Sequence, residues 1–151
     1  MNQHLTKPYL ENLIQAEDLA ETKIEELLRF FRQDDRLQDK LPNGMFAVDP
    51  RTEDRVLFNP VRARRPHDVE KPEPSKTKDR EDCPICAGDT TGVIDVAELS
   101  EGFTFINKNL FPVLYPFEYE PARGLHLLQC TSNYHHRDWQ NLPVSDCFTV
   151  I

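Results

Sequence analysis

The feature that most constrains this chain is a pair of cysteines, Cys83 and Cys86, separated by Pro-Ile. Two thiols at this spacing can hold one metal ion from a single tight turn. About fifty residues further on, an apolar run ends in Ser-Asn-Tyr followed by His135 and His136, and a Cys-x-x-Cys turn with a distant histidine suits zinc, which takes sulfur and nitrogen ligands in a tetrahedron. A zinc site would require the fold to bring the cysteine turn and the histidines together.

Adjacent histidines on an extended backbone point to opposite faces, so only one of this pair is expected to face the ion. Two other interpretations of the cysteine pair stay open. One is a thioredoxin-like redox pair, which lacks here the βαβ context that such a site needs, and the other is a pair of thiols without a ligand. Cys130 and Cys147 have no such spacing and are interpreted as small apolar core residues.

Apolar residues from Leu10 to Phe31 recur mostly at steps of three and four, which predicts one long helix or two short ones over residues 8–38. Pro42-Asn-Gly44 then ends the pattern with turn chemistry. We therefore interpret residues 1–42 as an amino-terminal helical extension, which packs either on the remaining domain, residues 43–151, or on a partner subunit.

The rest of the chain predicts an antiparallel sheet. Two short apolar runs around a polar turn predict a hairpin, and residues 66–82, rich in Pro, Lys, Glu and Asp, predict an exposed loop. The last residues, from Ser145, resemble the start of another strand. The predicted strands are Phe46–Val48, Arg55–Phe58, Phe103–Ile106 and Leu125–Cys130. The predicted fold class is α+β.

Charge is unevenly distributed and argues for a small phosphorylated ligand. The formal net charge of −8 disfavours nucleic acid as a partner. Residues 51–80 nevertheless hold nine Lys and Arg against six Asp and Glu, whereas residues 81–151 hold three against ten. No run approaches the roughly 20 apolar residues of a membrane span, and the amino terminus has no signal-peptide pattern, so we expect a cytoplasmic protein without a membrane partner.

Five short motifs follow one another along residues 46–151. They are Asn59-Pro-Val-Arg-Ala-Arg-Arg-Pro66, Cys83-Pro-Ile-Cys-Ala-Gly88, Phe103-Thr-Phe-Ile-Asn107, Ala122-Arg-Gly124 and Cys130-Thr-Ser-Asn-Tyr-His135. In this order they resemble the amino-terminal half of the galactose-1-phosphate uridylyltransferases, a family of the histidine-triad superfamily. The resemblance implies a histidine-triad-like half-barrel behind the helical extension, and the extension itself lies outside it.

The resemblance also implies an activity. Members of the family transfer a nucleoside monophosphate between a nucleoside diphosphate sugar and a sugar phosphate through a nucleotidyl-histidine. Related branches are nucleoside-diphosphate-sugar phosphorylases or diadenosine-polyphosphate phosphorylases, and the sequence does not choose between these activities or between uridine and adenine. The implied partners are the sugar nucleotide and the sugar phosphate, and a homodimer is compatible with the family.

Position by position, the resemblance assigns zinc to Cys83, Cys86 and His135. It assigns contacts with the phosphates of the sugar nucleotide to Arg62 and Arg65, whose planar guanidinium groups suit phosphate oxygens.

The resemblance assigns to Asn107 a contact with the nucleotide near its base and ribose. Asn109 can take that role instead, because the chain carries two extra residues in Asn107-Lys-Asn-Leu-Phe-Pro112. Taken without the resemblance, an Asn-rich turn is the simpler interpretation of both asparagines.

The largest departure from the family is the absence of its His-Pro-His motif, which holds the fourth zinc ligand and the nucleophilic histidine. We therefore expect the sequence to be a fragment that does not catalyse by itself. A hypothesis of a different class is a zinc-stabilised interaction module that supplies all four ligands within these residues, with His136 or Cys130 as the fourth.

Overall fold

The structure is a computed structural model that describes residues 5–10, 12–42, 45–64, 83–117 and 123–151. Its contacts divide the chain into two compact units. The first unit comprises Met1–Glu21, Val69–Lys108 and Leu128–Ile151, and the second comprises Thr22–Asp68 and Asn109–Leu127. The predicted α+β class with antiparallel pairing is confirmed. The loop predicted for residues 66–82 lies outside the described residues.

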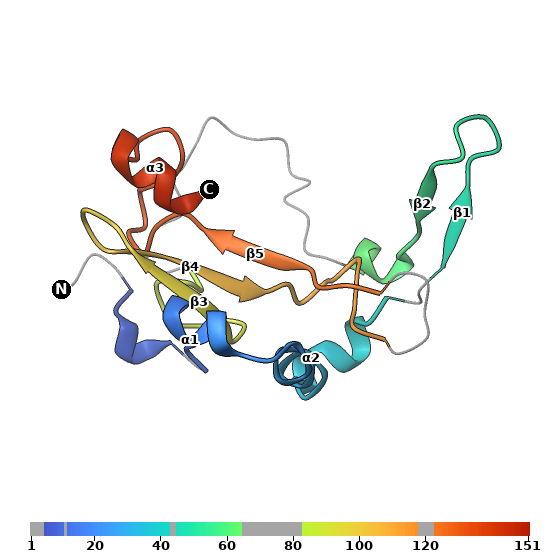
Figure 1. The fold of residues 1–151 in the computed structure, drawn as a ribbon, viewed down its shortest axis with the longest axis horizontal. Helices are drawn as coiled ribbons and strands as arrows, with labels where there is room; N and C mark the ends of the chain where they lie inside the picture. Colours follow the sequence, from blue (N-terminus) through green and yellow to red (C-terminus); the bar gives the residue numbers. More distant parts are fainter. Residues whose placement is uncertain (1–4, 11, 43–44, 65–82, 118–122) are drawn as a thin grey trace. The chain divides into compact units, whose positions relative to one another are not determined.

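The first unit contains a three-stranded sheet with the order β3-β4-β5 (Figure 1). Its strands are β3, Val93–Glu98; β4, Phe103–Lys108; and β5, Leu127–Cys130. The strands β4 and β5 were predicted, whereas β3 was not. In β3 the apolar run is interrupted by Asp95, where the pairing with β4 shifts register. An irregular strand of this kind loses the strict alternation by which strands are recognised in a sequence.

One face of this sheet carries the core of the first unit. Two phenylalanines of β4, Phe103 and Phe105, pack with two valines of β3 and with Leu5, which is 2% exposed. Each large apolar side chain buried in this way contributes about 2 kcal/mol through the hydrophobic effect. Partly buried neighbours, namely Leu10, Leu13, Ile85 and Cys130, pack against this cluster. The amino-terminal segment is thus a component of the core of the first unit.

The helical region consists of short helices. This agrees with the predicted alternative of two short helices rather than with that of one long helix. These helices are η1, Lys7–Tyr9; α1, Ala16–Glu21; α2, Ile24–Arg32; and η2, Asp35–Lys40. In the first unit α1 contacts β3. In the second unit α2 has acidic residues in its first turn and arginines in its last turn, which complements the helix dipole. Among the described residues, no helix combines the length and apolarity needed to cross a membrane.

The second unit contains the predicted hairpin. Its strands are β1, Phe46–Val48, and β2, Arg55–Leu57, which pair antiparallel with Ala47 opposite Val56. Asp49 shapes the turn, because its carboxylate accepts hydrogen bonds from the backbone N–H and the guanidinium of Arg51. These bonds hold the pKa of the Asp49 carboxyl below its usual value. A short helix, η3, Pro60–Arg64, follows the hairpin.

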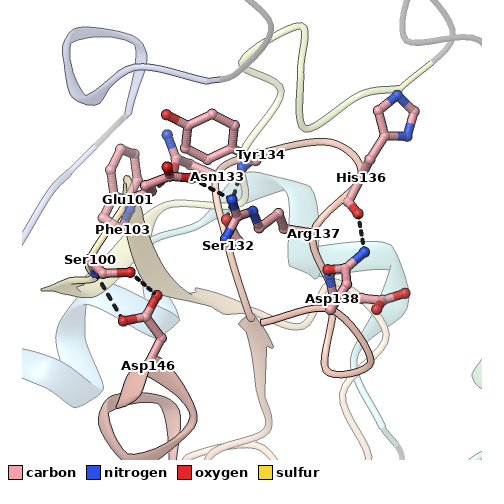
Figure 2. A network of polar contacts seen from close by, with 11 residues as sticks. Ser100, Glu101, Phe103, Ser132, Asn133, Tyr134, His136, Arg137, Asp138 and Asp146 are labelled. Carbon is pink, nitrogen blue, oxygen red and sulfur yellow. Dashed lines mark hydrogen bonds and ion pairs between the residues drawn. The ribbon is translucent and has the colours of Figure 1, made fainter. Parts of the chain in front are cut away.

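The carboxyl-terminal residues form a helix, so the strand expected from Ser145 is wrong. The helix α3, Val144–Val150, begins directly after Pro143 and contacts β3. Asp146 is 4% exposed and accepts hydrogen bonds from the backbone N–H of Ser100, at 3.0 Å, and from its hydroxyl, at 2.7 Å (Figure 2). This anchor fixes the segment as a helix although Phe-Thr-Val-Ile favours strands, because tertiary contacts override a weak local preference.

The anchor at Asp146 predicts a specific pH dependence of stability. The two bonds from Ser100 lower the pKa of the Asp146 carboxyl from its ordinary value of 3.8. A lowered pKa in the folded state means that this contribution is present above the ordinary pKa and is lost as the pH falls through the folded-state pKa. We therefore expect Asp146→Asn to lower the midpoint of urea unfolding at pH 7, and the gap from wild type to shrink progressively below about pH 4. A gap that stays constant down to pH 2 would contradict the ionic character of the anchor.

Candidate metal centre

The cysteine pair lies in a tight turn that the local sequence determines. The backbone N–H of Ala87 donates to the carbonyl of Cys83 at 3.1 Å, and that of Gly88 donates to the carbonyl of Ile85 at 3.0 Å. Gly88 completes the turn with φ of 82°, a conformation that glycine adopts at little cost. Both thiols are half-buried and neither forms a disulfide.

His135 comes from a loop that follows β5 and is held by polar contacts. The backbone N–H of Tyr134 donates to the hydroxyl of Ser132 at 3.1 Å. Arg137, on the other side, forms an ion pair with Glu101, and its guanidinium lies 5.9 Å from the ring centre of Tyr134 (Figure 2). The backbone around the histidine is therefore fixed on both sides.

Asn133 is the central support of this loop, and it was missed in the sequence. It is 3% exposed, its side-chain oxygen accepts from the backbone N–H of Phe103 at 2.9 Å, and its amide donates to the carbonyl of Leu5 at 2.8 Å. It thus ties the histidine loop to the start of β4 and to the amino-terminal segment. An asparagine between Ser132 and Tyr134 offers no local signal of this role, because both of its partners are distant in the sequence.

The two segments bring Cys83, Cys86 and His135 together. Their ligand atoms all lie within 4.8 Å of one another, and Sγ of Cys86 lies 3.2 Å from Nδ1 of His135. With zinc–sulfur and zinc–nitrogen bonds of about 2.3 and 2.0 Å, a tetrahedral site separates such a pair by roughly 3.5 Å. The donor set and spacing therefore fit a metal ion. His136 is exposed, and its ring meets that of His135 edge-on, so one histidine of the pair joins the cysteines, as predicted.

The other two cysteines do not belong to this group. Cys130 packs against the core of the first unit, and its burial, with a smaller effect of Cys83, raises the pKa of its thiol to about 11. The geometric group contains neither Cys130 nor His136, the two residues that the interaction-module hypothesis nominates as a fourth ligand.

The two candidate asparagines have different surroundings. Asn107, on β4 in the first unit, is 3% exposed, and its side-chain oxygen has no hydrogen-bond donor among the described residues. Asn109, in the second unit, uses both polar atoms. Its oxygen accepts from the backbone N–H of Phe111 at 2.8 Å, and its nitrogen lies 3.1 Å from Nε2 of His126. Asn109 thus supports a turn, whereas Asn107 presents a buried acceptor.

Of the two candidate phosphate ligands, only Arg62 can be placed, since Arg65 lies outside the described residues. Arg62 belongs to η3 in the second unit and donates through Nη1 to the carbonyl of Phe111 at 2.7 Å. Asn59 begins the same turn by accepting from the backbone N–H of Val61 at 3.0 Å. One of the five guanidinium donors is therefore used to hold the loop around Phe111.

Comparisons with protein-family models, with curated proteins and with solved structures found no match to this chain. The family resemblance therefore depends on the five motifs alone. The geometry adds to it that a metal ion could bind at Cys83, Cys86 and His135.

Proposed function

We propose that this chain carries the zinc centre and part of the nucleotide site of a nucleotidyltransferase resembling the galactose-1-phosphate uridylyltransferases. The observation that best supports the proposal is the convergence of Cys83, Cys86 and His135. The resemblance nominated these three residues from two separate motifs. On this proposal the sheet β3-β4-β5 is part of a histidine-triad-like half-barrel.

Zinc has an architectural role in this proposal. Two thiolates and an imidazole are ligands that zinc prefers, and the ion would tie the cysteine turn to the loop after β5. The resemblance places the fourth ligand and the nucleophilic histidine in a His-Pro-His motif, which does not occur in these 151 residues. A site closed by four protein ligands leaves no position for an activated water molecule, so the ion stabilises the fold without taking part in the reaction.

The buried oxygen of Asn107, which has no donor among the described residues, supports the nucleotide assignment. A buried acceptor without a donor costs about 1–3 kcal/mol, so such groups usually have a partner in the functional state. An N–H of a nucleobase or a ribose hydroxyl would supply the missing donor. Asn107 rather than Asn109 is therefore our candidate for the nucleotide contact, because the polar atoms of Asn109 are engaged within the second unit.

Arginines in the motif around η3 would offset the charge of the phosphates. Arg62 keeps one donor on Phe111, and its remaining donors can bind phosphate oxygens in the bidentate manner typical of guanidinium groups. In the reaction implied by the resemblance, a histidine attacks the α-phosphorus and the nucleotidyl group is then passed to an acceptor. Positive donors next to the phosphates would lower the barrier of both steps.

The alternative is a zinc-stabilised interaction module, and the hairpin of the second unit favours it. Every residue of β1 and β2 is exposed, and large apolar side chains such as Val48, at 51%, and Val56, at 46%, lie among them. An isolated two-stranded hairpin is only marginally stable in water, and exposed apolar residues of this size are typical of surfaces that bind another protein. A module of this kind would bind zinc but no sugar nucleotide.

Nucleotide binding separates the two proposals. Calorimetry of the zinc-loaded chain with UDP-glucose should detect binding on the transferase proposal. The variants Arg62→Ala and Asn107→Ala should each weaken it about tenfold, the equivalent of one charge-assisted or buried hydrogen bond. The matched control is Arg64→Ala, which removes an exposed arginine of the same helix that the resemblance does not assign.

Three outcomes are informative in this experiment. Unchanged affinity in Arg62→Ala would refute the phosphate assignment. Zinc-loaded protein that binds neither UDP-glucose, ADP-glucose nor diadenosine tetraphosphate would favour the interaction module. A preference among these three ligands would identify the base and the branch of the family.

A further inference from the structure

The amino-terminal segment of the first unit contacts both loops that carry the metal ligands. On one side, the backbone N–H of Leu5 donates to the carbonyl of Asn133 at 3.1 Å, and the side-chain amide of Asn133 donates back to the carbonyl of Leu5 at 2.8 Å. Asn133 lies two residues before the ligand His135. These two hydrogen bonds, one from the backbone and one from the Asn133 side chain, hold the segment against the histidine loop.

On the other side, the same segment contacts the cysteine turn. A methyl group added at Gly88 would lie 3.4 Å from Cβ of Tyr9 and 3.7 Å from its carbonyl oxygen, so Tyr9 lies next to Gly88 with room for about one methyl group between them. Gly88 is two residues after the ligand Cys86. Ile85, which lies between the two cysteines, packs against the cluster that contains Leu5.

Further contacts fix the position of the segment between these two points. Lys7 forms an ion pair with Glu98 at the end of β3, and its ammonium group lies 5.6 Å from the ring centre of Phe103. Leu5 itself is buried among the valines of β3 and the phenylalanines of β4. The segment from Leu5 to Tyr9 is thus held by polar and apolar contacts along its length.

We propose that residues Leu5–Tyr9 act as a strap that positions the cysteine turn relative to the histidine loop, so that docking of the strap and metal binding stabilise each other. This inference rests on the metal centre proposed above and does not depend on the nucleotidyltransferase activity. The segment lies outside the motifs of the family resemblance. It supplies no ligand atom, so Leu5 and Tyr9 are positioning residues.

Thermodynamic linkage makes the coupling reciprocal. If the strap raises metal affinity, metal binding must stabilise the docked strap by the same factor. Residues that orient metal ligands without binding the metal typically change metal affinity by about 10- to 100-fold. The strap contacts the loops rather than the ligand side chains, so we expect an effect at the lower end, about tenfold.

The first test measures zinc affinity by competition with a chromophoric chelator on the full chain. Leu5→Ala should bind zinc about tenfold more weakly than wild type. The matched control is Val150→Ala, which opens a cavity at an equally buried residue of α3. Its zinc affinity should stay within about twofold of wild type, because Val150 does not belong to the cluster that contains Leu5 and residues that share no partners act independently. Equal zinc affinities of Leu5→Ala and wild type would overturn the strap.

A second measurement needs no variant and covers the case in which Leu5→Ala does not fold. Hydrogen exchange of the wild-type chain, with and without zinc, should show slower exchange of the Leu5 amide by about tenfold when zinc is bound. The amide of Leu37, which donates to the carbonyl of Asp34 in the second unit, serves as the control and should not change. Unaltered exchange at Leu5 in zinc-bound protein would refute the coupling. If the wild-type protein binds no zinc, the proposed metal centre is refuted, and the proposed role of the strap is refuted with it.

Discussion

Replacing Cys83 by serine is expected to abolish stoichiometric zinc binding and to remove the stabilisation that zinc provides. A ligand that binds only the folded state at a free concentration of 1,000 times its dissociation constant raises the free energy of unfolding by about 4 kcal/mol. A hydroxyl is a poor substitute for a thiolate, which zinc requires in this donor set. In a chain of this length the loss corresponds to a fall of roughly 10 °C in the melting temperature.

The measurement has two parts, zinc content by atomic emission and thermal unfolding with and without a chelator. Wild type should hold one zinc per chain and lose stability when the chelator is added. Cys83→Ser should have the same melting temperature with and without the chelator, and this temperature should equal that of wild type in the presence of the chelator. The matched control is Cys147→Ser, which changes a half-buried cysteine of α3 outside the metal-binding group. Full zinc occupancy in Cys83→Ser would show that the site has been assigned to the wrong residues.

Replacing Gly102 by alanine is expected to lower the free energy of unfolding by about 3 kcal/mol, for two reasons. Gly102 lies in the turn between β3 and β4 with φ of 77°, where an alanine costs about 1 kcal/mol. Its new methyl group would also lie 2.0 Å from the side-chain oxygen of Asn133 and 2.6 Å from the ring of Tyr134. Asn133 would have to move, which breaks its buried bonds to Phe103 and Leu5 at a further cost of about 2 kcal/mol.

Gly88→Ala separates the two contributions. Gly88 has nearly the same backbone conformation, with φ of 82°, but a methyl group there meets only Tyr9 at ordinary van der Waals distance. It should therefore cost about 1 kcal/mol, the conformational part alone. Urea unfolding of both variants in the presence of a chelator excludes any effect through the metal. Equal costs of the two substitutions would show that the contact with Asn133 contributes nothing.

The group of residues that could hold a metal ion could be predicted because most of the signal is local. Four residues, Cys-Pro-Ile-Cys, suffice to place two thiols on one turn, and Gly88 follows where that turn needs a left-handed residue. The hairpin of β1 and β2 could be predicted for the same reason, since Asp49 and its neighbours form the turn by themselves. For the histidine ligand, the alternation of side chains along an extended backbone indicated that only one of His135 and His136 would lie next to the two cysteines.

Two elements that depend on contacts between distant residues were not predicted correctly. The helix α3 was predicted as a strand, and the strand β3 was not predicted. The segment after Pro143 has strand-forming residues and yet forms α3, because Asp146 bonds to Ser100. Pro143 before an acidic first turn is a helix-start signal that competes with this strand preference. The strand β3 escaped prediction because its register shift breaks the alternation that identifies strands.

By itself, the sequence determined what depends on residues a few positions apart, namely the cysteine turn, the hairpin and the helical periodicity before Pro42. The tertiary structure alone decided which groups from remote segments meet. It placed Leu5 in the core under β3 and β4, made Asn133 the link between three segments, and left the oxygen of Asn107 buried without a donor among the described residues. The physical reason is that short-range hydrogen bonds and backbone preferences act within one turn, whereas burial depends on which surfaces the whole chain can bring into contact.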